Sequence, residues 1–268
     1  MKNIPDFIIK PSEIKSYFGD NQHFVNYIKK ISKGLVQTSQ NFYNAVSKQQ
    51  PDALVPPMVF IIVMDLMKPF DQSAKPHIVP TEIPNELLGR SEESEKGMAL
   101  YIAGSLSEVY IAINMGATQR EDSKGKESLK STNKILGVVF HSEAAMVKVN
   151  KEDQDKYENE GLPPTKHPDR QDCYINTIST MAGEGVITYE MNTNADGIKV
   201  IDIDNPTCIL EFSNDDEVHS MQESRFSSLL PKALEYIQDV DKDFSIDDII
   251  NSEGMSNFAS KHSSVYKP

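Results

Sequence analysis

Tryptophan is absent from the 268 residues, and cysteine occurs only twice, at Cys173 and Cys208. Neither cysteine lies in a Cys-x-x-Cys or other metal-binding spacing. Both stand in apolar, strand-like surroundings, where a free cysteine behaves as a small core hydrophobe. A chain of this length can bury a large core without disulfides. We therefore expect two reduced thiols, with one disulfide as the alternative.

Long apolar runs are also missing. The longest, Met58–Met64, is far below the roughly 20 residues that cross a bilayer. The N-terminal residues lack the apolar segment and cleavage site of a signal peptide. The sequence therefore predicts a cytoplasmic protein, or one found in the host cytoplasm or the virion if a phage encodes it.

Positive charge is scarce: 27 lysines and arginines face 40 acidic residues, for a net charge of −13. Such a field repels phosphate backbones and anionic membranes, so we expect neither nucleic acid nor membrane as a partner. The lysines of the polar run 120–134 alternate with Glu, Ser, Asp and Asn, which is typical of a solvated loop. A protein partner or a second copy of the chain is the expected alternative.

Two segments have helical periodicity. Apolar residues recur every three or four positions over 24–46, where Asp20 or Asn21 is the expected N-cap. This stripe approaches a heptad, so it could pack on a partner, although packing on its own sheet is the ordinary outcome. The segment 98–115 also favours a helix, ending at Gly116, with a strand pair as the alternative. Residues 68–95 and 119–134 are rich in proline or charge and predict long connections.

A series of short apolar segments predicts the strands of one sheet. The first, 58–64, is uniformly apolar, which indicates a strand buried on both faces. The others, separated by loops or turn residues such as Gly183–Gly185 and Asp196-Gly197, are 135–149, 173–181, 186–191, 198–203 and 207–212. Short turns between consecutive strands favour antiparallel pairing.

These elements predict an α/β (α+β) fold, with a mixed, mainly antiparallel sheet that helices cover on at least one face. A further apolar stripe over 226–240 predicts a helix in a C-terminal helical arm. The expected division is an N-terminal extension over 1–19, a single domain over 20–215, the arm over 216–252 and a flexible tail over 253–268.

One stretch resembles a known pattern. The strand with Ser142-Glu143-Ala144, followed by a charged loop with Pro164 and the sequence His-Pro-Asp-Arg at 167–170, is similar to an uncharacterised family encoded by phages, plasmids and bacteria. Ala145 stands where that family has an aromatic residue, and Gln171 stands where it has an acidic one. The resemblance covers about the middle half of the chain. It implies a mobile-element setting and the strand topology, but no established activity.

The same stretch holds the first candidate site. Glu143, His167 and Asp169 could form a general acid–base group or bind a divalent metal. Ser142 and Arg170 are the candidate binding residues, because an arginine holds phosphate or carboxylate with two hydrogen bonds. The structural alternative is an Arg170–Glu143 ion pair that locks the loop to the sheet.

A second candidate is a weak cation site at Asp239, Asp241 and Asp243, which copies part of a calcium-binding loop. Phe244 replaces the glycine of the sharp turn, and Ile250 replaces the bidentate glutamate. The alternative is the end of one helix followed by the capped start of another.

No nucleotide-binding or hydrolase motif occurs in the sequence. We therefore expect a non-enzymatic interaction or structural protein, phage- or mobile-element-encoded, either associated with the virion or acting on a host protein. No cofactor is expected. The alternative function is a metal- or acid/base-dependent hydrolase that uses Glu143, His167 and Asp169.

Overall fold

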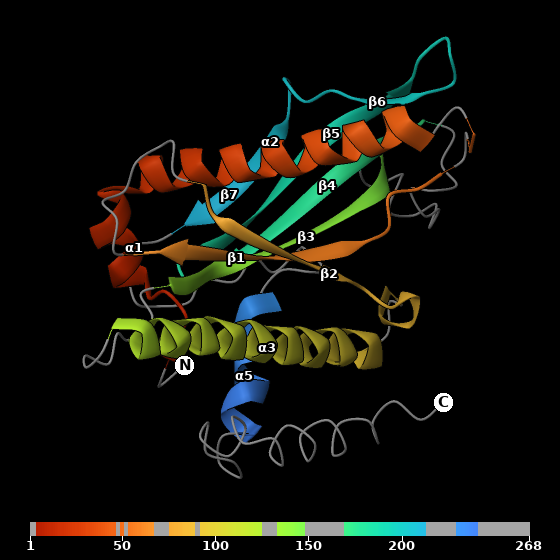
Figure 1. Cartoon of the computed structure of the whole chain (residues 1–268). Coiled ribbons are helices and arrows are strands. Elements are labelled where there is room, and N and C mark those ends of the chain that lie inside the picture. Colours follow the sequence, from red (N-terminus) through yellow and green to blue (C-terminus); the bar gives the residue numbers. More distant parts are fainter. Residues whose placement is uncertain are drawn as a thin grey trace.

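The computed structural model describes residues 4–46, 49–50, 53–66, 75–88, 92–124, 133–147, 169–212 and 229–240. Within these residues the chain forms a seven-stranded sheet whose strand pairs are all antiparallel (Figure 1). The order is β2-β1-β3-β4-β5, and different halves of β5 pair with β6 and β7. The strands are β1 (Met58–Asp65), β2 (His77–Glu82), β3 (Asn133–Val147), β4 (Arg170–Thr180), β5 (Gly183–Thr193), β6 (Lys199–Ile201) and β7 (Thr207–Phe212).

Helices cover both faces of the sheet. Figure 1 shows α1 (Pro11–Phe18) and α2 (Asn21–Val46) on one side, and α3 (Glu92–Lys124) and α5 (Leu229–Val240) on the other. Each side has its own cluster of buried apolar residues. The predicted mixed α/β fold, with a mainly antiparallel sheet and a C-terminal helical arm, is therefore confirmed.

Helix α2 confirms the helix predicted over 24–46 and begins slightly earlier. The Asp20 carboxylate accepts a hydrogen bond from the His23 backbone N–H at 2.7 Å, as an N-cap does. The apolar stripe, which includes Phe24, Ile28 and Leu35, is buried in the core cluster of its own sheet. The stripe therefore packs on its own sheet, which is the ordinary outcome.

Strand β1 is buried on both faces, as its uniformly apolar sequence predicts. Its alternate residues Val59, Ile61 and Val63 join the cluster on the α3 side. Ile62 and Met64 join the cluster on the α2 side. The side chains of a strand point to opposite faces in turn, so a strand between two helical layers needs apolar residues at nearly every position.

The prediction of a long connection over 68–95 is wrong in part. It contains β2, the short 3-10 helix η1 (Asn85–Leu88) and the start of α3. Strand β2 pairs on one side with β1, and Pro80 lies near its middle, opposite Phe60. An edge strand tolerates proline, because the missing N–H can face away from its neighbour. The prolines therefore do not exclude a strand here.

Two turn signals were also misplaced. Helix α3 confirms the helix predicted over 98–115, but it continues through Gly116 to Lys124, into the stretch expected as a loop. The Gln, Arg, Glu and Lys residues of that stretch are good helix formers. The turn between β4 and β5 is formed by Met181 and Ala182, while Gly183, with a φ of 143°, begins β5. The turn at Gly197, with a φ of 77°, is confirmed.

The expected N-terminal extension contributes to both cores. Ile8 lies in the cluster on the α3 side and Ile9 in the cluster on the α2 side, and neither side chain is exposed. The backbones of Phe7, Ile9 and Ile135 exchange two hydrogen bonds, which form a parallel bridge to β3. In the arm, α5 packs with Leu230 and Leu234 fully buried. The remainder of the arm and the tail lie outside the described residues.

Candidate functional site

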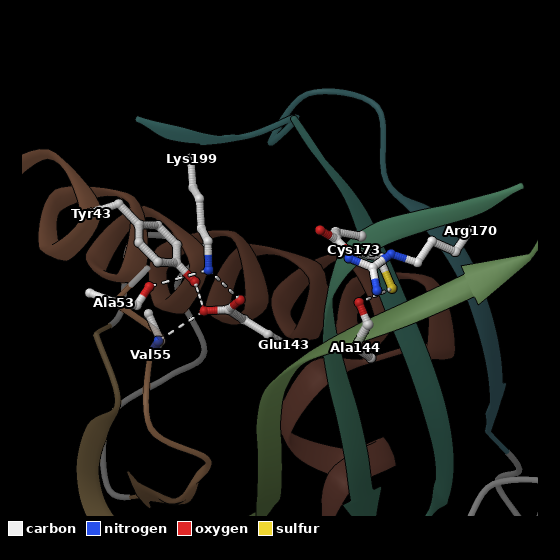
Figure 2. Close-up of polar contacts among 9 residues, drawn as sticks. Tyr43, Ala53, Val55, Glu143, Ala144, Arg170, Cys173 and Lys199 are labelled. Atoms are coloured by element: carbon white, nitrogen blue, oxygen red, sulfur yellow. Dashed lines mark hydrogen bonds and ion pairs between the residues drawn. The ribbon is translucent and has the colours of Figure 1, made fainter. Parts of the chain in front are cut away.

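The carboxylate of Glu143 lies where four parts of the chain meet (Figure 2). One oxygen accepts hydrogen bonds from the Tyr43 hydroxyl and from the Val55 backbone N–H, the latter at 2.9 Å. The other pairs with the Lys199 ammonium at 2.8 Å. Both side chains of this ion pair are less than one-fifth exposed. Glu143 therefore joins β3 to α2, to β6 and to the segment before β1.

Lys199 makes two further contacts in this cluster. Its ammonium donates to the Ala53 carbonyl oxygen at 3.2 Å and lies 5.4 Å from the centre of the Tyr43 ring. Burial, and then the hydrogen bond to Glu143, raise the pKa of the Tyr43 hydroxyl well above its ordinary value. The hydroxyl thus stays protonated and remains a donor to the carboxylate.

A row of buried polar side chains continues from Glu143 across the α2 face of the sheet. Nδ1 of His141, two residues before Glu143 on β3, is hydrogen-bonded to the Tyr174 hydroxyl at 2.5 Å. That hydroxyl is also hydrogen-bonded to Ser39 of α2 at 2.5 Å. Nearer the N-terminal end of α2, the Ser32 hydroxyl is hydrogen-bonded to the Tyr189 hydroxyl and accepts a 2.7 Å hydrogen bond from the Asn176 amide. The row therefore links α2 to β3, β4 and β5 by hydrogen bonds.

The imidazole of His141 is only 2% exposed. Burial lowers its pKa from 6.5 to about 4, and the nearby Pro56 carbonyl opposes this shift with a smaller effect. Its Nε2 makes no hydrogen bond of good geometry with the described residues, and neither does Oδ1 of Asn176. The imidazole is therefore neutral at pH 7, because a charged ring in this position would be costly.

An open pocket of about 610 Å³ adjoins Glu143. Its walls are residues 54–57, residues 82–84, Tyr101 of α3 and Glu143 itself. The Tyr101 hydroxyl donates to the Glu82 carbonyl oxygen at 2.8 Å, which fixes α3 to the end of β2. The pocket thus lies at the end of the sheet where β1 begins and β2 ends.

The residues of the first predicted site are dispersed or not described. Ser142 and Glu143 lie on β3, whereas Asp169 comes just before β4 and Arg170 begins it, opposite Val147. Arg170 forms an ion pair with Asp172, with Nε 3.7 Å from Oδ1. His167 lies outside the described residues. The expected Arg170–Glu143 pair is replaced by Lys199–Glu143, and Figure 2 shows the Arg170 side chain away from this pair.

Sequence reasoning missed the partners of Glu143. His141 is not one of these partners, but its place could be predicted, because residues i and i−2 of a strand lie on the same face. Tyr43 fits the helical stripe of α2, but nothing in its sequence neighbourhood predicts a hydrogen bond to Glu143. Lys199 lies on the three-residue strand β6, whose hairpin with β5 the Asp196-Gly197 turn predicts, but only the tertiary structure shows that it reaches Glu143.

Only one residue of the predicted cation site lies among the described residues. Asp239 is in the last turn of α5, and Asp241 and Asp243 lie outside the described residues. In the part of the chain that is described, no three His, Cys, Asp or Glu side chains gather as a metal site. Both cysteines are free thiols, and burial raises the pKa of Cys173 to about 12. This thiol is therefore protonated at pH 7 and a poor nucleophile.

No described helix is long and apolar enough to cross a membrane. Comparisons with protein-family models, with curated proteins and with solved structures found no match to the chain.

Proposed function

We propose that this protein is a non-enzymatic interaction or structural protein, whose work is to bind another protein or further copies of itself. The observation that carries the proposal is the saturation of Glu143 by Tyr43, Val55 and Lys199. A carboxylate that holds three donors from distant parts of the chain stabilises the fold. To accept a proton from a substrate it would first have to lose its ion pair.

The setting we propose is a phage or other mobile element, with the protein in the virion or acting on a host protein in the cytoplasm. The support for it is the similarity of Ser142-Glu143-Ala144 and of residues 167–170 to a family of such origin. The acidic net charge of −13 supports protein partners over nucleic acid.

The alternative, a metal- or acid/base-dependent hydrolase, would use Glu143, His167 and Asp169. A general base must reach the proton it abstracts, directly or through one water. In the described structure the Glu143 oxygens are directed to Lys199, Tyr43 and Val55 instead. The hydrolase is therefore the second choice.

Hydrolysis assays on the full chain separate the two functions. The wild type and His167→Ala are compared on p-nitrophenyl phosphate and p-nitrophenyl acetate, each with Mg²⁺, Mn²⁺ or Zn²⁺. We expect both proteins to give the rate of the buffer with metal alone. Turnover by the wild type that His167→Ala abolishes would overturn the proposal, because the chain would then use His167 in catalysis.

A further inference from the structure

Strand β3 is longer than its neighbour β1, and beyond β1 no described strand pairs with that edge of β3. The last residue of β3 that pairs with β1 is His141, opposite Met58. From Ser142 to Val147 the strand pairs with β4 on one side only, and no described strand lies along the other side. The N–H and C=O groups of such an edge are a template for another extended chain.

The pocket beside Glu143 adjoins this unpaired edge. Glu143 belongs both to the edge and to the pocket wall, and Leu54 and Pro57 are among the apolar residues of that wall. Leu54 is 64% exposed, more than any other large apolar residue of the described part of the chain. An extended segment that pairs with β3 would therefore reach an apolar pocket at the Ser142 end.

The charges of the pocket select the kind of segment. The charged side chains among its lining residues are Glu82 and Glu143, and neither lysine nor arginine lines it. Lys199 neutralises Glu143, which leaves the exposed residue Glu82 as the lining residue that contributes negative charge. The proximity of Glu82 also helps to raise the pKa of the Tyr101 hydroxyl, after burial and Glu108. A cationic side chain is complementary to this pocket.

We propose that the unpaired edge Ser142–Val147 and the adjoining pocket dock an extended segment of a partner protein that carries Lys or Arg beside an apolar residue. This inference rests on the proposed function as an interaction protein. Main-chain hydrogen bonds to β3 give the affinity, and the pocket at Glu82 gives the preference for a basic residue.

Other strand edges fit this role less well. The outer edge of β2 is interrupted by Pro80, which lacks an N–H. Strand β7 presents the half-exposed Ile209 and pairs with β5 alone among the described strands, but the pocket beside Glu143 includes none of its residues. It offers a competing site, and the test below includes it.

The test starts from a phage-displayed library of random nonapeptides selected on the immobilised full-length protein. Enriched peptides are synthesised with a fluorescent label, and their Kd is measured by anisotropy. We expect a shared Lys or Arg next to an apolar residue, and at least tenfold weaker binding when that basic residue becomes Glu. Two N-methylated forms of each peptide are then compared, one methylated at the odd-numbered amides and one at the even-numbered amides. Only one form should bind tenfold more weakly, because only one edge of the peptide pairs with β3.

Variants of the protein locate the site. Glu82→Lys should weaken binding at least tenfold, whereas Glu235→Lys, the same charge change at an exposed position of α5, should leave Kd within twofold. The proposal is overturned if no peptide is enriched, if N-methylation has no effect, or if Glu82→Lys binds as the wild type does. If Ile209→Asp weakens peptide binding and Glu82→Lys does not, the binding site is β7. That result would reject the site proposed here and leave the proposed function intact.

Self-association is measured on the same variants by light scattering. A wild-type dimer that Glu82→Lys converts to monomer would show that a second copy occupies the edge, which rejects the partner segment but retains the proposed function. Hydrolytic turnover lost in His167→Ala would reject the proposed function itself. The two failures are thus distinguishable.

Discussion

At the scale of single residues, the Glu143–Lys199 pair is the most buried of the ion pairs among the described residues. Both of its side chains are less than one-fifth exposed, whereas those of the Lys33–Asp204 pair are 57% and 83% exposed. Removing one partner of a buried pair leaves the other charge without compensation, which costs far more than breaking an exposed pair.

We predict that Glu143→Ala lowers the free energy of unfolding by about 2–3 kcal/mol, and that Glu143→Gln lowers it by about half as much. The glutamine still accepts from Tyr43 and Val55, but it leaves Lys199 without its counter-charge. Urea titration at pH 7 measures both values. Asp204→Ala is the matched control and should cost less than about 0.5 kcal/mol. Equal losses for Glu143→Ala and Asp204→Ala would show that Glu143 does not join the elements as described.

His141 makes the stability of the fold depend on pH. Its pKa is about 4 in the folded protein, compared with 6.5 as the ordinary value, so the unfolded chain binds the proton more tightly. Stability is then present above pH 6.5 and is lost as the pH falls toward 4. The groups that face the ring are Tyr174 of β4, Ser39 beyond it on α2, Phe60 of β1 and the Pro56 carbonyl.

We predict that acidification from pH 7 to 5 destabilises the wild type by about 2 kcal/mol more than it destabilises His141→Gln. Glutamine retains a polar partner for Tyr174 but does not titrate. Urea titrations of the two proteins at the two pH values give the difference. An NMR titration that gave the His141 ring a pKa of 6 or more would refute the prediction independently of the variant.

At the scale of elements, the close approach of β3 to β4 depends on a glycine. A Cβ on Gly137 would lie 2.6 Å from the Ser179 carbonyl oxygen and 2.8 Å from Cγ2 of Thr180. Because a backbone oxygen of a central strand cannot move away easily, the strands would have to separate locally. Gly34 of α2, by contrast, has nothing within 4 Å of the same position.

We therefore predict opposite effects for two glycine-to-alanine substitutions. Gly137→Ala should destabilise the protein by about 1–3 kcal/mol through overpacking. Gly34→Ala should stabilise it by up to about 1 kcal/mol, because alanine favours the helix. Thermal unfolding monitored by circular dichroism compares the two with the wild type. A neutral Gly137→Ala would mean that β3 and β4 are not as close at this point as described.

At the scale of the whole molecule, the N-terminal segment connects the two helical layers. Ile8 and Ile9 are adjacent in sequence but enter opposite cores, and their backbone is hydrogen-bonded to β3 between those cores. A segment that contributes to both layers should make the layers unfold together.

We predict that Ile8→Ala and Ile9→Ala each destabilise the protein by about 2–4 kcal/mol, as expected for fully buried isoleucines. Far-UV circular dichroism and tyrosine fluorescence should give coincident urea transitions in both variants. Leu54→Ala, at an exposed side chain, should cost less than about 0.5 kcal/mol. Separate transitions for the two probes, or variants as stable as the wild type, would show that the segment is an appendage.

Most elements could be predicted from the sequence because they follow local patterns. The apolar stripe of α2, the uniformly apolar β1 and the turn at Gly197 needed only their own residues. Strand β2 was missed because an edge strand has one solvent-facing side and tolerates a proline, so its pattern resembles a loop. The end of α3 was missed because its polar residues favour a helix as well as a loop.

The sequence by itself determined the mixed fold, its antiparallel sheet and the position of Glu143 on a strand, since these depend on periodicity and on turns between neighbouring residues. Only the tertiary structure decided which groups surround that carboxylate. Tyr43 is 100 residues from it in the chain and Lys199 is 56. Contacts over such separations depend on the register of β3 and on how α2 crosses the sheet, and no local pattern of residues encodes either.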